Sequence, residues 1–188
     1  MSLRVLGTIC LLSGMAFGQT PAPLPPIDAH ERVHWLVVEN LAPAGLLDTL
    51  AVAAIQTAAN APKEYGPHWM GFAKRSGLIT ANYAVKSTME AGLGAMWGED
   101  PRYDQTEGKP FGARVGHVIS RTFMARNRAG KTMPAYARFL AIPGSAFLYN
   151  EWIPDSQATA NQAVALTGLG FLSRMGENAW NEFIHRRK

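Results

Sequence analysis

The sequence predicts an all-α fold, in a single domain of five or six helices, from three observations. Apolar residues recur at helical spacing in several long segments, and no segment shows the alternating pattern of a strand. Glycine and alanine are frequent inside those segments, which is typical of helices that cross at short distances. Charged residues make up 17% of the chain, below the usual quarter or so, which indicates extensive contact between helices or with a membrane.

The chain begins as a secretory signal peptide does. Arg4 is followed by an apolar run over residues 5–17 and by a small-residue cleavage site. The run is shorter than the roughly 20 residues that cross a membrane, so we favour a cleaved signal peptide over residues 1–18 to an N-terminal anchor. The only cysteine, Cys10, leaves with this peptide, and the exported chain then has no disulfide or thiol chemistry.

A helical domain is expected to follow the signal peptide. Residues 19–27 form a proline-rich spacer, which we expect to be extended. The domain then covers residues 28–188. Asp28 is the expected N-cap of its first helix, 29–40, and Glu31 completes a capping box three residues later.

The same helix contains the one catalytic motif that we identify, HExxH, at His30, Glu31 and His34. On a helix the two histidines lie one turn apart and could share a zinc ion, with Glu31 as the base that activates bound water. No strand precedes the motif to bind a substrate, and no third histidine follows at the expected spacing. We therefore assign no catalytic, cofactor or metal residue, and we keep a zinc-dependent hydrolase as the alternative.

Three long helices are expected to form the core, at 43–60, 71–98 and 156–184. The first has Asp48 as its only charge and is nearly apolar all round. A helix of this kind is either buried or lipid-facing, and its modest length favours a buried core helix.

The central helix, 72–97, carries a polar stripe of Asn82, Lys86 and Glu90 at four-residue steps. We favour a solvent-exposed face for this stripe. The alternative is a face that meets another helix inside lipid, where polar groups are costly and are usually matched.

Segment 99–110 is predicted to be a polar connection. Asp100 and the proline after it favour a turn, and Arg102 is available to pair with a carboxylate. The next helix, 111–126, has a basic face that could meet anionic lipid headgroups or another acidic surface. Nucleic acid is not an expected partner of an exported chain. The basic residues of this segment and its end are Arg114, Arg121, Arg126 and Arg128.

The C-terminal part is predicted to contain a short helix, 134–141, that is broken at Pro143. Asp155 or Ser156 then caps the last helix, which runs to about Ile184. Pairs of small residues on these helices are compatible with a homo-oligomer in which helices pack closely. They are Gly94 with Gly98, Gly112 with Gly116, and the series Gly168, Gly170 and Gly176.

Four phrases resemble a family of small exported bacterial proteins of unknown function. They are KEYGPHW at 63–69, GFAKR at 71–75, MEAGLGAMWGEDPRY at 89–103 and PAYAR at 134–138, and GEDPRY is the most distinctive part. The resemblance covers most of the exported chain. It implies a helical envelope protein and supplies no activity, cofactor or catalytic residue.

These observations predict a structural or membrane-associated component of the bacterial cell envelope, in the periplasm or at the outer membrane. Membrane lipids or other envelope proteins are the expected partners, and no cofactor is expected. Besides the zinc hydrolase, a soluble periplasmic binding module is a second alternative, which would need an apolar pocket with convergent polar groups. The aromatic residues that could line such a pocket are Trp69, Trp97, Tyr103, Trp152 and Trp180.

Overall fold

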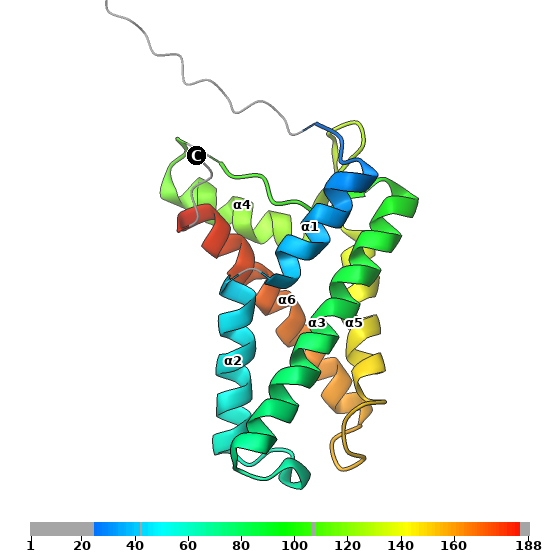
Figure 1. Cartoon of the computed structure of the whole chain (residues 1–188). Helices are drawn as coiled ribbons and strands as arrows, with labels where there is room; N and C mark the ends of the chain where they lie inside the picture. The colour runs from blue at the N-terminus through cyan, green and yellow to red at the C-terminus, as the bar shows by residue number, and fades with distance from the viewer. Residues whose placement is uncertain (1–24, 42, 107, 185–188) are drawn as a thin grey trace, which may run out of the picture.

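The computed structural model describes residues 25–41, 43–106 and 108–184, and it confirms the all-α prediction (Figure 1). The predicted signal peptide lies outside the described residues. The elements in chain order are α1 (Ala29–Leu41), α2 (Pro43–Ala58), the 3₁₀ turn η1 (Lys63–Tyr65), α3 (Trp69–Trp97), β1 (Glu99–Asp100), α4 (Phe111–Phe123), β2 (Met124–Asn127), β3 (Thr132–Pro134), α5 (Tyr136–Tyr149) and α6 (Ala160–Phe183).

The helices form an elongated bundle with a cap at one end. α3 is the central helix and packs against α5, α2 and α1, while α6 packs against α5 and α4. Figure 1 shows α2, α3, α5 and α6 along the length of the bundle, with α1 and α4 at the upper end. We call α1, α4, the three strands and residues 101–110 the cap. We call the two connections at the opposite end, residues 59–68 and 150–159, the base.

The boundaries of α3 follow from two residues whose local geometry suits a helix end. His68 is extended and its Nδ1 accepts a hydrogen bond from the N–H of Gly71 at 3.3 Å, which satisfies a free donor of the first turn. Gly98 ends the helix in the left-handed region, at φ 73°, where a residue without Cβ is favoured. α3 is therefore slightly longer at its start than the predicted segment 72–97.

A small antiparallel sheet in the cap was not predicted. β2 lies between β1 and β3, with Asp100 opposite Arg126 and Ala125 opposite Met133. The helix expected over 111–126 therefore ends at Phe123, where the chain enters β2. Strands of two to four residues are too short to show an alternating pattern.

The last two helices differ from the prediction at their starts and at Pro143. α5 continues through Pro143 to Tyr149. The proline removes one backbone hydrogen bond of the helix, and the packing of α5 between α3 and α6 offsets that loss. The methyl group of Met89 would lie only 2.7 Å from a Cβ at residue 144, so the glycine there permits close contact with α3. α6 is capped by Thr159, whose hydroxyl accepts from the N–H of Gln162.

The distribution of apolar and charged residues is the reverse of that in most globular domains. The largest fully buried side chains include Arg75, Glu90, Glu99 and Asn178. In α2, by contrast, Leu47 is 61% exposed, so the prediction of a buried core helix over 43–60 is wrong. The physical reason is that α2 covers α3 with its small residues, and its large apolar residues point outward.

Candidate functional site

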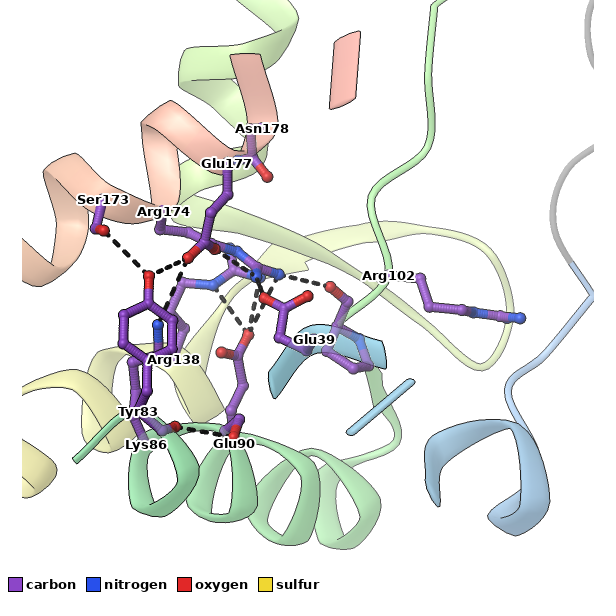
Figure 2. Close-up of polar contacts among 12 residues, drawn as sticks. Glu39, Tyr83, Lys86, Glu90, Arg102, Arg138, Ser173, Arg174, Glu177 and Asn178 are labelled. Carbon is purple, nitrogen blue, oxygen red and sulfur yellow. Dashed lines mark hydrogen bonds and ion pairs between the residues drawn. The ribbon is translucent and has the colours of Figure 1, made fainter. Parts of the chain in front are cut away.

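Six buried or half-buried charged residues form one network in the middle of the bundle (Figure 2). They come from α1, α3, α5 and α6, so four helices meet at this point. Three are cationic and three are anionic, and the network is therefore neutral as a whole. We call this group the ionic network; its members are Glu39, Lys86, Glu90, Arg138, Arg174 and Glu177.

Arg138 and Glu90 form the most deeply buried pair. The Nε and Nη2 atoms of Arg138 both lie 3.0 Å from Oε1 of Glu90. Nη1 of Arg138 donates to the carbonyls of Arg121 and Thr122, at 2.7 and 2.9 Å. This guanidinium therefore ties α5 to α3 and to the end of α4.

Arg174 connects the same pair to the outer carboxylates. Its Nη1 donates to Glu39 and lies 3.3 Å from Glu177, and its Nη2 lies 3.8 Å from Glu90. Nη2 also donates to the carbonyl of Pro101 at 2.8 Å, which joins the network to the cap. Each buried carboxylate and guanidinium group in the network needs a partner of opposite charge, since an unpaired buried charge is very costly.

The polar stripe of α3 is thus buried, and the prediction of a solvent-exposed face for it is wrong. Lys86 is 7% exposed and Glu90 is 2% exposed, and Asn82 is half-buried. The residues that compensate the buried charges of this stripe do not lie on α3 or next to it in the sequence. The partners of Glu90 lie on α5 and α6, and only the tertiary fold brings them to this face.

A hydrogen-bonded chain leads from the network to the surface of α2. The hydroxyl of Tyr83 donates to Glu177 and lies 3.1 Å from Oγ of Ser173. Ser173 in turn donates to Asp48 at 3.0 Å. The ammonium of Lys86 lies 3.7 Å from the centroid of the Tyr83 ring, which is a cation–π contact.

A cavity of about 560 Å³ opens beside this chain of polar groups. It extends through the interior of the bundle from the base to the ionic network, between α2, α3, α5 and α6. Its opening lies between α2 and α6, because α2 packs on α3 and α1 but touches α6 little. Its wall is mainly apolar. One set of polar groups lies at the network end, and Gln56, Gln157 and Gln162 line the cavity as well. Residues that line it include Leu47, Val52, Ile142, Leu166, Leu169 and Trp180 on the apolar side, and Asp48, Asn82, Tyr83, Lys86, Ser173 and Glu177 on the polar side.

A second acidic centre lies in the cap around Glu182, at the end of α6. Tyr103, Thr106 and Arg114 donate to its carboxylate, at 2.9, 2.6 and 2.9 Å. Burial alone would raise the pKa of Glu182, but these hydrogen bonds outweigh it and hold the pKa below its ordinary value. The carboxylate is therefore a stable anion that joins residues 103–106 and α4 to α6.

The basic face of α4 points toward these acidic residues of the cap. Arg121 is 7% exposed and lies 2.5 Å from Asp104, and Arg126 also pairs with Asp104. The interpretation of this segment as a free basic surface for lipid headgroups is therefore wrong. Sequence analysis identified an acidic surface as one candidate partner, and that acidic surface belongs to the chain itself.

A third centre lies at the base and contains one arginine, Arg75, that has no carboxylate partner among the described residues. Arg75 is 1% exposed, and its guanidinium donates to the carbonyls of Ala61, Pro62 and Gly66 at 2.9, 2.8 and 2.8 Å. Thr57 accepts a further hydrogen bond at 3.3 Å. We call this group the turn centre. The phrases at 63–69 and 71–75 therefore close a turn around Arg75.

The most distinctive phrase of the resemblance, 99–103, holds the cap together. Arg102 pairs with Asp100 at 2.7 Å and with Glu31 at 3.3 Å, which confirms that Arg102 binds carboxylates. Oε2 of Glu99 accepts from a backbone N–H at the start of α5. These residues position helices and do not converge on a reacting centre in the described part of the chain.

The HExxH residues lie on the outer side of α1. Glu31 donates its backbone N–H to Asp28 and accepts from the N–H of Asp28, which confirms the capping box. His30 and His34 are both exposed. Among residues 25–41, 43–106 and 108–184, no group of three or more histidine, cysteine, aspartate or glutamate side chains is placed to hold a metal ion.

The predicted small-residue contacts fall into two groups. At Gly94 and Gly170 a Cβ would meet other segments within 3.0 Å, and Gly170 lies at the crossing of α6 with α5. At Gly168 and Gly176 an added Cβ would meet nothing within 4 Å; Gly168 is exposed, and Gly176 lines the cavity between α2 and α6. Contact of the second group with another copy of the chain stays a prediction.

Sequence analysis missed the ionic network as a site. The charged residues of α3 were identified, but Arg138 and Arg174 were not connected to them. One signal could have found them, because each is the only basic residue within its helix, and α5 has no acidic residue to pair with Arg138. A buried arginine in such a helix requires an acidic partner from elsewhere in the fold.

Comparisons with known proteins found no matching family model, no matching curated protein and no matching solved structure.

Proposed function

We propose that this protein is a membrane-embedded structural component of the bacterial cell envelope. The observation that carries the proposal is the outer surface of the bundle. Across α2, α3 from Ser76 on, α5, and α6 as far as Trp180, the only exposed charged side chain is that of Asp48. We call this surface the apolar belt. Its large exposed residues include Leu46, Leu47, Leu50, Ile55, Met96, Phe139, Leu140, Phe147, Leu148, Val164, Leu169 and Leu172.

The height of the apolar belt suits a bilayer. Residues 76–97 of α3 carry no exposed charge, and a helix of this length rises roughly 33 Å at 1.5 Å per residue. The hydrocarbon core of a bilayer is about 30 Å thick. Monomeric soluble proteins rarely expose apolar patches of more than a few hundred Å².

Both borders of the belt carry aromatic and charged residues, as expected at a membrane interface. At the base, Trp69 is 75% exposed and Trp152 is 40% exposed. At the cap end, Trp97 and Tyr136 are 44% and 51% exposed. Most exposed charged residues lie beyond these rings: Lys63, Glu64, Glu151 and Asp155 at the base, and Asp28, Lys109, Arg128 and Lys131 at the cap. Lys74 lies just over one helical turn inside Trp69 on α3.

The polar interior explains why hydropathy gives little indication of this arrangement. By length and composition one stretch of the described residues, Ala29–Ala58, is apolar enough to cross a membrane. α3 and α6 are long enough, but their charged residues lower the mean hydropathy. Those charges are paired inside the bundle, which is where ionisable residues of membrane proteins are found.

The test places one charge on the belt. Leu140 is 52% exposed on α5, and Leu140→Arg would be nearly neutral if this surface faced water. In lipid such a change costs about 2.5–3.5 kcal/mol at the bilayer centre, and less at Leu140, which lies one helical turn from the border residue Tyr136. We expect wild type to stay in the membrane pellet after carbonate extraction and Leu140→Arg to be extracted or degraded. Ala129→Arg, on an exposed turn of the cap, is the matched control and should behave as wild type.

The result also decides between this proposal and the zinc hydrolase. A freely soluble wild-type protein that contains stoichiometric zinc, lost in His30→Ala, would overturn the proposal. Equal recovery of wild type and Leu140→Arg in the soluble fraction would overturn it as well and would favour a soluble periplasmic module.

A further inference from the structure

We propose that the cavity between α2 and α6 is a binding site for one phospholipid with a phosphoethanolamine headgroup. One acyl chain would occupy the apolar part of the cavity, and the headgroup would bind Lys86 and Asp48. This inference rests on the proposed function, because the ligand enters from lipid. It goes further by naming a ligand class and the residues that select it.

The opening of the cavity lies within the apolar belt. Leu47, Leu169 and Leu172 line the cavity and are also 61%, 58% and 62% exposed. A hydrocarbon chain in the surrounding lipid therefore meets a continuous apolar surface from the belt into the cavity. The cavity volume of about 560 Å³ is in the roughly 300–1,000 Å³ range of small-molecule sites.

Lys86 supplies the anion-binding half of the headgroup site. It lines the cavity, it is 7% exposed, and in the described part of the chain its only ion-pair partner is Glu177, at 3.9 Å. No acceptor of those residues lies within hydrogen-bonding distance of its ammonium. A phosphate oxygen in the cavity would supply the acceptor that this buried cation lacks.

Asp48 supplies the cation-binding half. It is exposed at the opening, and within the described residues its carboxylate accepts one side-chain hydrogen bond, from Ser173. Asp48 is also the one exposed charge on the apolar belt, where an unmatched carboxylate is costly. A primary amine can donate to its free lone pairs, whereas a quaternary ammonium group has no N–H to donate.

The two binding groups carry opposite charges, so they favour a zwitterionic headgroup. The anionic headgroup of phosphatidylglycerol would satisfy Lys86 but would leave Asp48 unmatched next to it. A free fatty acid has the same disadvantage. Asn82 lines the same cavity, and its amide oxygen has no hydrogen-bond partner within the described residues.

The experiment measures lipid that remains bound to the purified full chain. Wild type, extracted in mild detergent, is analysed by native mass spectrometry and then reloaded from vesicles of phosphatidylethanolamine, phosphatidylcholine, phosphatidylglycerol or oleic acid. We expect about one phosphatidylethanolamine per chain. Val52→Trp, which fills the cavity wall, should reduce bound lipid at least tenfold, and Ile55→Trp, which points outward from the same helix, should not.

Asp48→Asn tests the headgroup separately from the acyl chain. It should still bind lipid but lose the preference for phosphatidylethanolamine over phosphatidylglycerol. Three outcomes would overturn the inference: wild type without bound lipid, equal lipid in the two tryptophan variants, or a preference for phosphatidylglycerol or oleic acid in wild type. Carbonate extraction of the same samples keeps the two proposals apart. Wild type that stays in the pellet but binds no lipid contradicts only the cavity ligand.

Discussion

Two buried arginine centres lie at different heights of the bundle and are stabilised in different ways, one by neutral oxygens and one by carboxylates. The turn centre surrounds Arg75 with carbonyl oxygens from residues at most 14 positions away, plus one hydroxyl. In the ionic network, Arg174 is neutralised by Glu39 and Glu177 and lies near Glu90. Arg75 is thus held by a local turn, and Arg174 is held only when distant helices have assembled. The difference separates residues that shape one segment from residues that depend on the complete fold.

Among substitutions in these centres, Glu90→Gln is expected to lower the free energy of unfolding most. It removes the carboxylate next to Arg138 and leaves two buried guanidinium groups with too few anions. Breaking a buried pair in this way costs about 3–5 kcal/mol. Denaturant titration of the protein in detergent micelles, followed by circular dichroism, measures the loss across the whole fold.

The control for this prediction is Thr88→Val, an exposed position on the same helix. Addition of Arg138→Met to Glu90→Gln should recover part of the lost stability, because the double variant no longer buries an unmatched charge. Stability of Glu90→Gln equal to that of Thr88→Val would show that the network is not a buried electrostatic unit.

Arg75→Met should have a smaller and more local effect. It leaves the carbonyls of Ala61, Pro62 and Gly66 without donors, and hydrogen bonds to a charged group are worth about 1.5–3 kcal/mol. We expect rapid proteolysis within residues 59–68 while the cap stays resistant. Equal loss of protection in the cap would contradict the local role of the turn centre.

The centre at Glu182 is an intermediate case, and its contribution should depend on pH. Its folded pKa is lowered, so the stability that it contributes is complete above the ordinary carboxyl pKa of 4.5 and is lost as the pH falls through the lower folded pKa. Glu182→Gln should flatten the fall in melting temperature between neutral and acidic pH. Identical pH profiles of wild type and Glu182→Gln would contradict this assignment.

Thr57→Val should have the smallest effect. The hydroxyl of Thr57 accepts from Arg75 at 3.3 Å, which is the longest hydrogen bond of the turn centre. We expect a loss of about 0.5–1 kcal/mol, because the three carbonyls continue to hold the guanidinium. A loss as large as that of Arg75→Met would mean that the hydroxyl, and not the turn, positions the arginine. Denaturant titration of both variants side by side makes this comparison.

Local signals predicted the parts of this fold that depend on neighbours in the sequence. The capping box at Asp28, the end of α3 at Gly98 and the pairing of Arg102 all follow from residue type and spacing over a few positions. The strands of the cap were not predicted, since each contains too few residues to show an alternating pattern. The continuation of α5 through Pro143 was not predicted either, because tertiary packing outweighs the loss of one hydrogen bond.

The ionic network was not predicted as a site, because its charges pair across helices that are far apart in the sequence. A polar stripe such as Lys86 and Glu90 has the same pattern whether it faces water or a charged neighbour. Its environment is decided by Arg138 and Arg174, which lie 48 and 84 positions beyond Glu90. The exposure of the large apolar residues of α2 has the same cause, because an apolar helix shows the same sequence pattern whether its outer face is covered or exposed.

For the membrane-embedded state that we propose, the ionic network also constrains the order in which the helices can insert. α3 is synthesised before α5 and α6, so the carboxylate of Glu90 has no guanidinium partner until both later helices have been made. A helix with an unmatched charge inserts poorly on its own. Under this proposal insertion is concerted: the chain stays accessible to water, or bound to a chaperone, until α6 is complete. A chain that is truncated before α5 should accumulate outside the membrane.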